Sequence, residues 1–199
     1  PATRDDMLQT IEEEGTRLAR YVSNLLDMTR IEAGTIEPAR EWIDPSDVVR
    51  EAAEMGRRNH PEAKIETSIA DRMPLITGDA VLLQQVLFNL IDNAVKHAGG
   101  EPITLYARPD AADIMISVTD LGKGIPTGEL TKIFEKFFRG GGKSDGRVIG
   151  TGLGLAIAKG FVEAMGGTIS ATSPAVRKRG TRFTIRLPIP PQPDLEREN

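Results

Sequence analysis

The chain of 199 residues contains no cysteine and only two histidines. The absence of thiols excludes disulfide bonds and thiolate metal sites, and two histidines are too few for a histidine-rich metal centre. No apolar run approaches the about 20 residues of a membrane-spanning helix. The first residues also lack the pattern of a signal peptide. These absences predict a soluble, cytoplasmic region.

Basic residues are not in excess, because 25 lysines and arginines stand against 29 acidic residues, for a net charge of -4. Nucleic-acid-binding proteins favour a basic face, so we expect no nucleic-acid partner. The content of 39% hydrophobic and 27% charged residues is typical of a globular protein. The length allows one sizeable core with an appendage.

Residues 1–34 have the pattern of one long helix that ends near Gly34. Its apolar positions alternate three and four apart and form a seam of Leu8, Ile11, Gly15, Leu18, Val22 and Leu25. A heptad seam of this kind predicts a partner helix. Packing of the same face on the rest of the chain is the alternative, and Arg20 is expected on the opposite face.

The remainder predicts a linker over residues 35–46, a domain over residues 47–188 and a disordered tail over residues 189–199. A short strand is expected around Trp42, followed by a helix that either Asp44 or Ser46 caps and that runs to about Arg58. Further helices are expected over residues 79–97 and 153–165. Strands are expected over residues 65–69, 73–76, 103–107, 114–118, 168–171 and 182–187. Because the helices do not alternate strictly with the strands, the fold class is α+β, a two-layer α/β sandwich preceded by one long helix.

A polar stripe on the helix over residues 79–97 is the first candidate site. Asn89 and Asn93 lie one turn apart, and Lys96 and His97 follow one turn later on the same side. Asparagine oxygens suit Mg²⁺, and a lysine supplies a charge for phosphate. The alternative is a solvated helix face.

Two glycine-rich segments supply the rest of the candidate site. Asp120 begins a turn that contains Gly122, Gly124 and Ile125, and its carboxylate could accept a hydrogen bond from an exocyclic amine such as that of adenine. An ordinary turn is the alternative there. The second segment leads directly into a helix, whose first amides favour phosphate; its candidate residues are Gly150, Thr151, Gly152, Leu153 and Gly154. Neither a Walker A loop nor a dinucleotide fingerprint fits it.

The segment between these two is rich in glycine and aromatic residues. Residues 140–147 are predicted to be a lid over a triphosphate, with a disordered loop as the alternative. Phe134 and Phe137 are expected to anchor that lid or to lie in the core. Arg139 could reach phosphate or the partner helix. His60, at the end of a helix, is expected to be a surface residue without chemistry.

The four segments, in this order, resemble the N, G1, F and G2 boxes of sensor histidine kinases. The resemblance runs from about Leu8 to Pro188, with the long helix similar to the second helix of the dimerisation hairpin. Residues 40–49, together with residues 96–98, are most similar to the Kdp type of potassium-responsive sensor kinase. The resemblance implies a Bergerat-type ATP-binding fold, with Thr181 near the adenine.

This resemblance also implies a reaction and its partners. Asn93, assisted by Asn89, would ligate Mg²⁺, while Lys96 contacts phosphate and His97 flanks the nucleotide. The γ-phosphoryl group of ATP would pass to a histidine and then to an aspartate of a response regulator. The parent protein would be a homodimer through the hairpin and anchored in the inner membrane.

The chain departs from the family pattern because it contains no phosphoacceptor box, so no catalytic histidine is assigned. We expect the chain to bind Mg-ATP without labelling itself, as a kinase cut after its first hairpin helix would. Two alternatives are a nucleotide-binding regulatory module without transfer and a GHKL-type ATPase or serine kinase. The related ATPases carry a glutamate where Asn89 stands. The absence of that glutamate from this chain disfavours hydrolysis.

Overall fold

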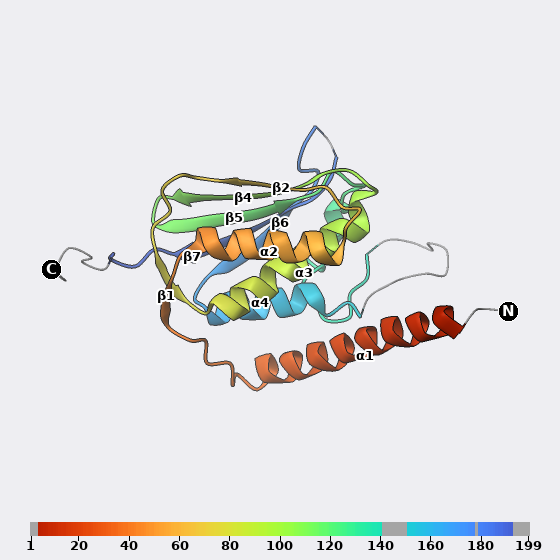
Figure 1. Cartoon of the computed structure of the whole chain (residues 1–199). Helices are drawn as coiled ribbons and strands as arrows, with labels where there is room; N and C mark the ends of the chain where they lie inside the picture. Colours follow the sequence, from red (N-terminus) through yellow and green to blue (C-terminus); the bar gives the residue numbers. More distant parts are fainter. Residues whose placement is uncertain (1–3, 141–150, 178, 193–199) are drawn as a thin grey trace.

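The computed structural model describes residues 4–140, 151–177 and 179–192, and it contains four α-helices and seven strands in this part of the chain (Figure 1). The helices are α1 (Arg4–Glu32), α2 (Pro45–Asn59), α3 (Ala80–Ala98) and α4 (Gly154–Ala164). The strands are β1 (Glu41–Ile43), β2 (Ile65–Ile69), β3 (Ile76–Gly78), β4 (Ile103–Asp110), β5 (Asp113–Thr119), β6 (Thr168–Thr172) and β7 (Arg182–Pro188). A single 3-10 turn, η1, covers Thr127–Glu129. No helix of these described ranges is long and apolar enough to cross a membrane.

Five strands form one mixed sheet in the order β2-β4-β5-β7-β6. Strands β2 and β4 are parallel, whereas every other neighbouring pair is antiparallel. β1 and β3 form a separate antiparallel pair, with Ile43 opposite Ile76. This topology brings the end of β5 beside the start of β7, which matters because a loop of the candidate site lies at each of these two points.

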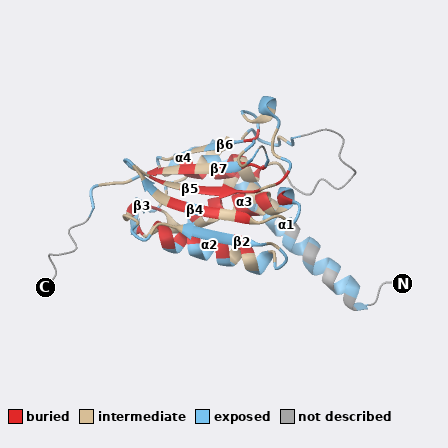
Figure 2. Cartoon of the chain, turned by 90° about the horizontal axis from the view of Figure 1, so that it is seen from above, coloured by how far each residue is buried: buried red, intermediate tan, exposed pale blue. Residues whose placement is uncertain are grey.

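Helices α2, α3 and α4 lie together on one face of the five-stranded sheet (Figure 1). Strand residues that alternate inward, such as Leu105, Ile116 and Ile185, are fully buried beneath them. The buried positions cluster between the helices and the sheet (Figure 2). The predicted α+β two-layer sandwich is therefore confirmed.

Helix α3 lies at the centre of this layer and is held at both ends by residues that its sequence supplies. Asp79 caps its start, where the carboxylate accepts a hydrogen bond from Leu82 N at 3.0 Å. Gly99 ends the helix in the left-handed conformation, at φ 64°. Its buried face consists of Leu83, Val86, Leu87, Leu90, Ile91, Ala94 and Ala98. The opposite side of α3 is thereby left for polar residues.

Helix α1 runs beside α4 (Figure 1), and residues near its C-terminal end pack on this layer. Met28 is buried, and Ile31 fits against α4 where Gly160 has no side chain: a Cβ there would lie 2.7 Å from Ile31 Cδ1. Gln85 of α3 donates to Asp27 at 2.7 Å, and Lys136 pairs with Glu32. The leucine, isoleucine and valine side chains of the heptad seam are each more than half exposed. The seam therefore does not pack on the described residues of the chain, which do not support that alternative.

Two boundaries differ from the expectations, and the structure decides between the two residues expected to cap α2. The third strand begins at Ile76 rather than Met73, because only residues from Ile76 onward align with β1, and Pro74 has no N–H to donate to a ladder. The cap of α2 is Asp44, whose carboxylate accepts from Ser46 N at 2.7 Å. Residues 189–192 were expected in the disordered tail, yet Gln192 exchanges two hydrogen bonds with the backbone of Leu75.

Candidate nucleotide site

Helix α3 presents the predicted polar stripe beside the start of α4. Asn89 is partly buried, and a Cβ on Gly154 would lie 3.8 Å from its Oδ1 atom. Asn89 Nδ2 is buried and has no hydrogen-bond partner among the described residues. Because an unsatisfied buried amide is costly, this atom indicates a place where a ligand or its water shell completes the structure. Asn93 lies one turn further along and is also partly buried.

Asp120 follows β5 directly and is nearly inaccessible, with 2% of its surface exposed. Its Oδ1 atom accepts hydrogen bonds from Gly122 N at 2.8 Å and from Thr181 N at 3.3 Å. The backbone N of Asp120 in turn donates to Thr181 O at 2.9 Å. The turn after β5 and the start of β7 are thus joined around one carboxylate.

Glycine is required where these segments meet. A Cβ on Gly122 would lie 2.0 Å from the carbonyl oxygen of His97, and one on Gly180 would lie 1.9 Å from that of Asp120. Gly124 adopts a φ of 75°, and a Cβ there would lie 2.6 Å from Ser173 Oγ. That hydroxyl accepts from Ile125 N at 2.8 Å and fixes the far side of the turn. The end of α3, the turn after β5 and the loop before β7 therefore form one floor.

The second glycine segment lies at the other end of the stripe. Gly152 adopts a φ of 71°, and its carbonyl oxygen accepts from Phe137 N at 3.0 Å. Thr151 Oγ1 accepts from Leu153 N at 3.3 Å, and the buried Leu153 leads into α4. No side chain caps the first amides of α4 within the described residues. These amides therefore point to where the sequence predicts phosphate.

The aromatic segment gives a mixed result. Phe134 packs edge-on against the buried ring of Phe183, with centroids 6.2 Å apart, as a core anchor should. Phe137 is 64% exposed, so its ring does not lie in the core, and the alternative role as an anchor of the lid stays a prediction. Its backbone, at a φ of 60°, instead holds the Gly152 loop. Arg139 is exposed at the edge of the described chain, whereas Gly150 and residues 141–147 of the predicted lid lie outside the described residues.

A pocket of about 560 Å³ opens between the end of α3 and the turn after β5. Its lining includes the predicted residues Lys96, His97 and Gly122. It also includes Glu101, Lys123 and Arg179, which sequence reasoning did not select. Arg179 Nη2 donates a hydrogen bond to Leu121 O at 2.9 Å and forms an ion pair with Glu101 Oε1 at 3.3 Å. The sequence could have indicated two of these lining residues, because Lys123 lies inside the first glycine turn and Arg179 directly precedes Gly180.

Two titratable groups of the candidate site, Asp120 and His97, are shifted towards their neutral forms. Burial raises the pKa of Asp120 above its ordinary value, although the hydrogen bonds from Gly122 and Thr181 and the nearby His97 act to lower it. Burial, and then the positive charge of Lys123, lower the pKa of His97 below 6.5. Lys96 adds to this lowering, while Asp120 opposes it. A neutral imidazole beside a buried acceptor suits an uncharged, planar ligand group better than a charged one.

Comparison with known proteins agrees with this geometry. Residues 78–191 match the family described as histidine kinase-, DNA gyrase B- and HSP90-like ATPase, and this segment contains every element of the site. The chain belongs to this family. Its members among the relatives below are sensor kinases, so the resemblance to the ATP-binding region of sensor histidine kinases is confirmed.

Individual relatives support the same assignment. The chain is 37% identical over 187 residues to the sensor protein KdpD of Escherichia coli strain K12. The aligned region is 94% of the chain but only 20% of that protein. The crystal structure of full-length ShkA in complex with AMPPNP is 29% identical, with a TM-score of 0.78 over 94% of the chain and 39% of that structure. The mycobacterial sensor histidine kinase MprB is 30% identical, with a TM-score of 0.66 over 76% of the chain and all of that structure. The chain thus spans about a fifth of the length of the curated relatives it matches.

Proposed function

We propose that the chain binds Mg-ATP and forms the catalytic part of a two-component sensor histidine kinase. The observation that carries this proposal is the buried carboxylate of Asp120, which accepts hydrogen bonds from Gly122 N and Thr181 N next to the pocket that Gly122 and His97 line. The solved relative with AMPPNP, an ATP analogue, supports the same ligand.

The adenine would bind at this floor. The two hydrogen bonds that Asp120 accepts from the backbone go to Oδ1, so Oδ2 is the atom we assign to the exocyclic amine of adenine. His97 would flank the ring as a neutral imidazole. Gly122, Gly124, Ile125 and Thr181 would shape the walls, because a side chain at either glycine would collide with backbone or with Ser173.

The triphosphate would extend along α3 towards the start of α4. Lys96 would meet phosphate oxygens as a point charge, and the amides of Gly152 and Gly154 would receive them at the helix start, where Leu153 leads into α4. We assign Gly150, Thr151 and Arg139 to the same end. The described residues include no group of three or more histidine or acidic side chains that could hold a metal. A Mg²⁺ ion would depend on the side-chain oxygens of Asn93 and Asn89 and on the phosphate oxygens. The unsatisfied Asn89 Nδ2, a donor, would bind a phosphate oxygen or a water of the ion rather than the ion itself.

The reaction would be transfer of the γ-phosphoryl group to a histidine nitrogen and then to an aspartate of a response regulator. Bound Mg²⁺ would neutralise charge on the phosphates, while the residues of the chain position them. Within residues 1–199, His60 and His97 both lie outside a phosphoacceptor box, so we propose that these residues alone do not label themselves. The seam of α1 would pair with a hairpin helix, in a homodimeric parent protein that is anchored in the membrane.

Calorimetric titration with Mg-ATP tests the pocket. The native chain should bind, and Asp120→Asn should weaken binding about 10- to 100-fold, as loss of a hydrogen bond to a charged group does. The variant should keep its stability or gain some, because it removes a buried carboxylate while retaining an acceptor for Gly122 N and Thr181 N. Equal binding by both proteins would contradict the assignment of Asp120.

A transfer assay tests the enzymatic part. A separate hairpin with a phosphoacceptor histidine, mixed with the chain and labelled ATP, should acquire acid-labile phosphate. Binding of ATP without such transfer would favour a regulatory module, whereas steady release of phosphate would favour an ATPase.

A further inference from the structure

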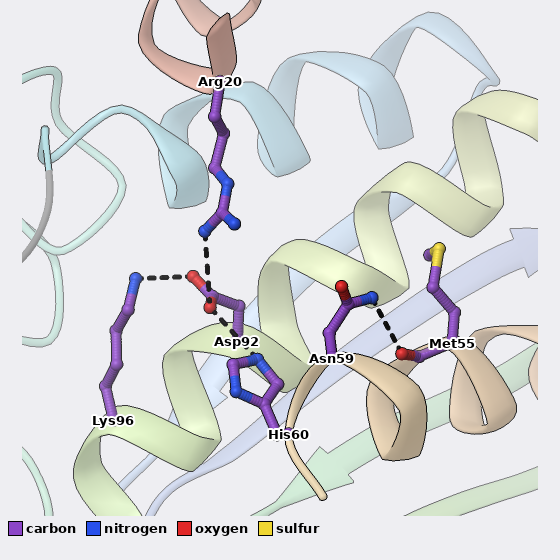
Figure 3. A network of polar contacts seen from close by, with 6 residues as sticks. All are labelled: Arg20, Met55, Asn59, His60, Asp92 and Lys96. Atoms are coloured by element: carbon purple, nitrogen blue, oxygen red, sulfur yellow. Dashed lines mark hydrogen bonds and ion pairs between the residues drawn. The ribbon is translucent and has the colours of Figure 1, made fainter. Parts of the chain in front are cut away.

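Asp92 joins three helices through polar contacts, two of which come from residues distant in the sequence (Figure 3). Its Oδ2 atom accepts from Lys96 Nζ at 2.5 Å, one turn along α3. Its Oδ1 atom lies 3.9 Å from Arg20 Nη1 of α1 and 3.3 Å from His60 Nε2 at the end of α2. His60 was expected to be a surface residue without chemistry, and Arg20 was expected on the face of α1 opposite the heptad seam.

The environment of Asp92 makes these contacts strong enough to matter. Its side chain is 14% exposed, compared with 33% for Lys96 and 48% for Arg20. A carboxylate at this depth loses much of its hydration, so it depends on the positive groups around it. His60 Nε2 is buried and lies 3.3 Å from Oδ1, but it makes no hydrogen bond to that atom. Arg20 and Lys96 therefore share the one charge of Asp92.

The pairing of Asp92 with both Arg20 and Lys96 affects nucleotide binding through Lys96. The lysine that we assign to phosphate is held by a carboxylate that competes with phosphate for the same ammonium group. When Arg20 lies beside Oδ1, it offsets part of the negative charge of Asp92 and weakens the competition. When α1 moves away, Asp92 and Lys96 remain as a closed, neutral pair.

We propose that Asp92 is a positioning residue that couples the placement of helix α1 to the affinity for the ATP polyphosphate. Contact between Arg20 and Asp92 releases Lys96 for phosphate, and loss of that contact retains Lys96 on Asp92. By thermodynamic reciprocity, bound ATP favours the docked position of α1. The inference rests on the proposed function, because it requires Lys96 to contact phosphate.

A double-mutant cycle measures this coupling. Arg20→Ala should weaken Mg-ATP binding about two- to fivefold, in keeping with a partly exposed ion pair. Asp92→Asn should tighten it by about the same factor, because the competing charge is gone. In the Asp92→Asn background, Arg20→Ala should have no further effect. Asp92→Glu, which keeps the charge, should restore the dependence on Arg20.

Two controls separate this coupling from a general change of charge and from a loss of folded structure. Arg30→Ala removes the same charge from the same helix, yet Arg30 is not among the contacts of Asp92, so ATP binding should not change. Adenosine, which has no phosphate, should bind all variants equally. A merely structural role for Asp92 would weaken adenosine and ATP alike.

The outcomes are distinct. An equal effect of Arg20→Ala in both backgrounds, or a loss of ATP affinity in Asp92→Asn, would overturn the coupling. If Asp92→Asn fails to fold, the affinities of Arg20→Ala and Arg30→Ala for ATP and for adenosine still test the coupling. Failure of the native chain to bind ATP would instead refute the proposed function.

Discussion

Helices α1 and α3 are both amphipathic, but only α3 finds its apolar partner within the described chain. The buried face of α3 lies against the sheet and its neighbouring helices, and Leu83, Leu87 and Leu90 are fully inaccessible. The seam of α1 points into solvent, with Leu18 63% exposed. A helix whose packing is complete can present asparagines to a ligand, whereas a helix with an uncovered seam indicates a second polypeptide surface.

The largest difference should appear in stability. Leu87→Ala should lower the free energy of unfolding by about 2–5 kcal/mol, because it leaves a cavity in a fully packed core. Leu18→Ala should change it by no more than about 0.5 kcal/mol, since the side chain is mostly exposed. Urea denaturation of the two variants measures both quantities. A similar cost at the two positions would show that the seam of α1 is covered by this chain after all.

A second comparison concerns association. If the seam pairs with another helix, as proposed, the double variant Leu18→Ser with Leu25→Ser should raise the dissociation constant for self-association about 100-fold or more, since burying each leucine contributes about 1.5–3 kcal/mol. Sedimentation over a range of concentrations measures the constant. A native chain that stays monomeric at the highest concentration would contradict this pairing.

The smallest effect concerns pH. His97 has a lowered pKa in the folded chain, so on acidification the unfolded chain takes up the proton first. The native chain should therefore lose stability relative to His97→Asn as the pH falls through 6.5 towards the lowered folded value. Parallel denaturation curves of the two proteins between neutral and mildly acidic pH isolate this difference from the contribution of carboxylates. A constant difference across that range would mean that burial does not disfavour the charged imidazole.

Local sequence signals predicted most of the fold. Periodicity located α3 and the strand pairs, and Asp79 and Gly99 marked the ends of α3 almost to the residue. The start of β3 was missed because a strand exists only where it has a partner, and the partner, β1, lies more than 30 residues away. The exposure of Phe137 was missed because its positive φ follows from the contact with Gly152, which no local pattern contains.

The candidate site shows the same division. Asp120 and the glycines were recognisable because their spacing is local, and the structure gathers them with His97 and Thr181. The network at Asp92 could not be predicted, because Arg20 and His60 reach it from 72 and 32 residues away along the chain. For Arg20, the helical pattern predicts the face opposite the seam, but it does not predict which neighbour that face meets.

The contact between Ile31 and Gly160 gives α1 the mechanics of a lever. The helix is seated there near its C-terminal end, and with a rise of 1.5 Å per residue its far end lies about 40 Å from this seat and Arg20 about 16 Å from it. A tilt of about 10° would therefore move the far end by about 7 Å and Arg20 by about 3 Å. A small rotation of the helix would thus suffice to open the contact at Asp92 while Ile31 remained in its notch.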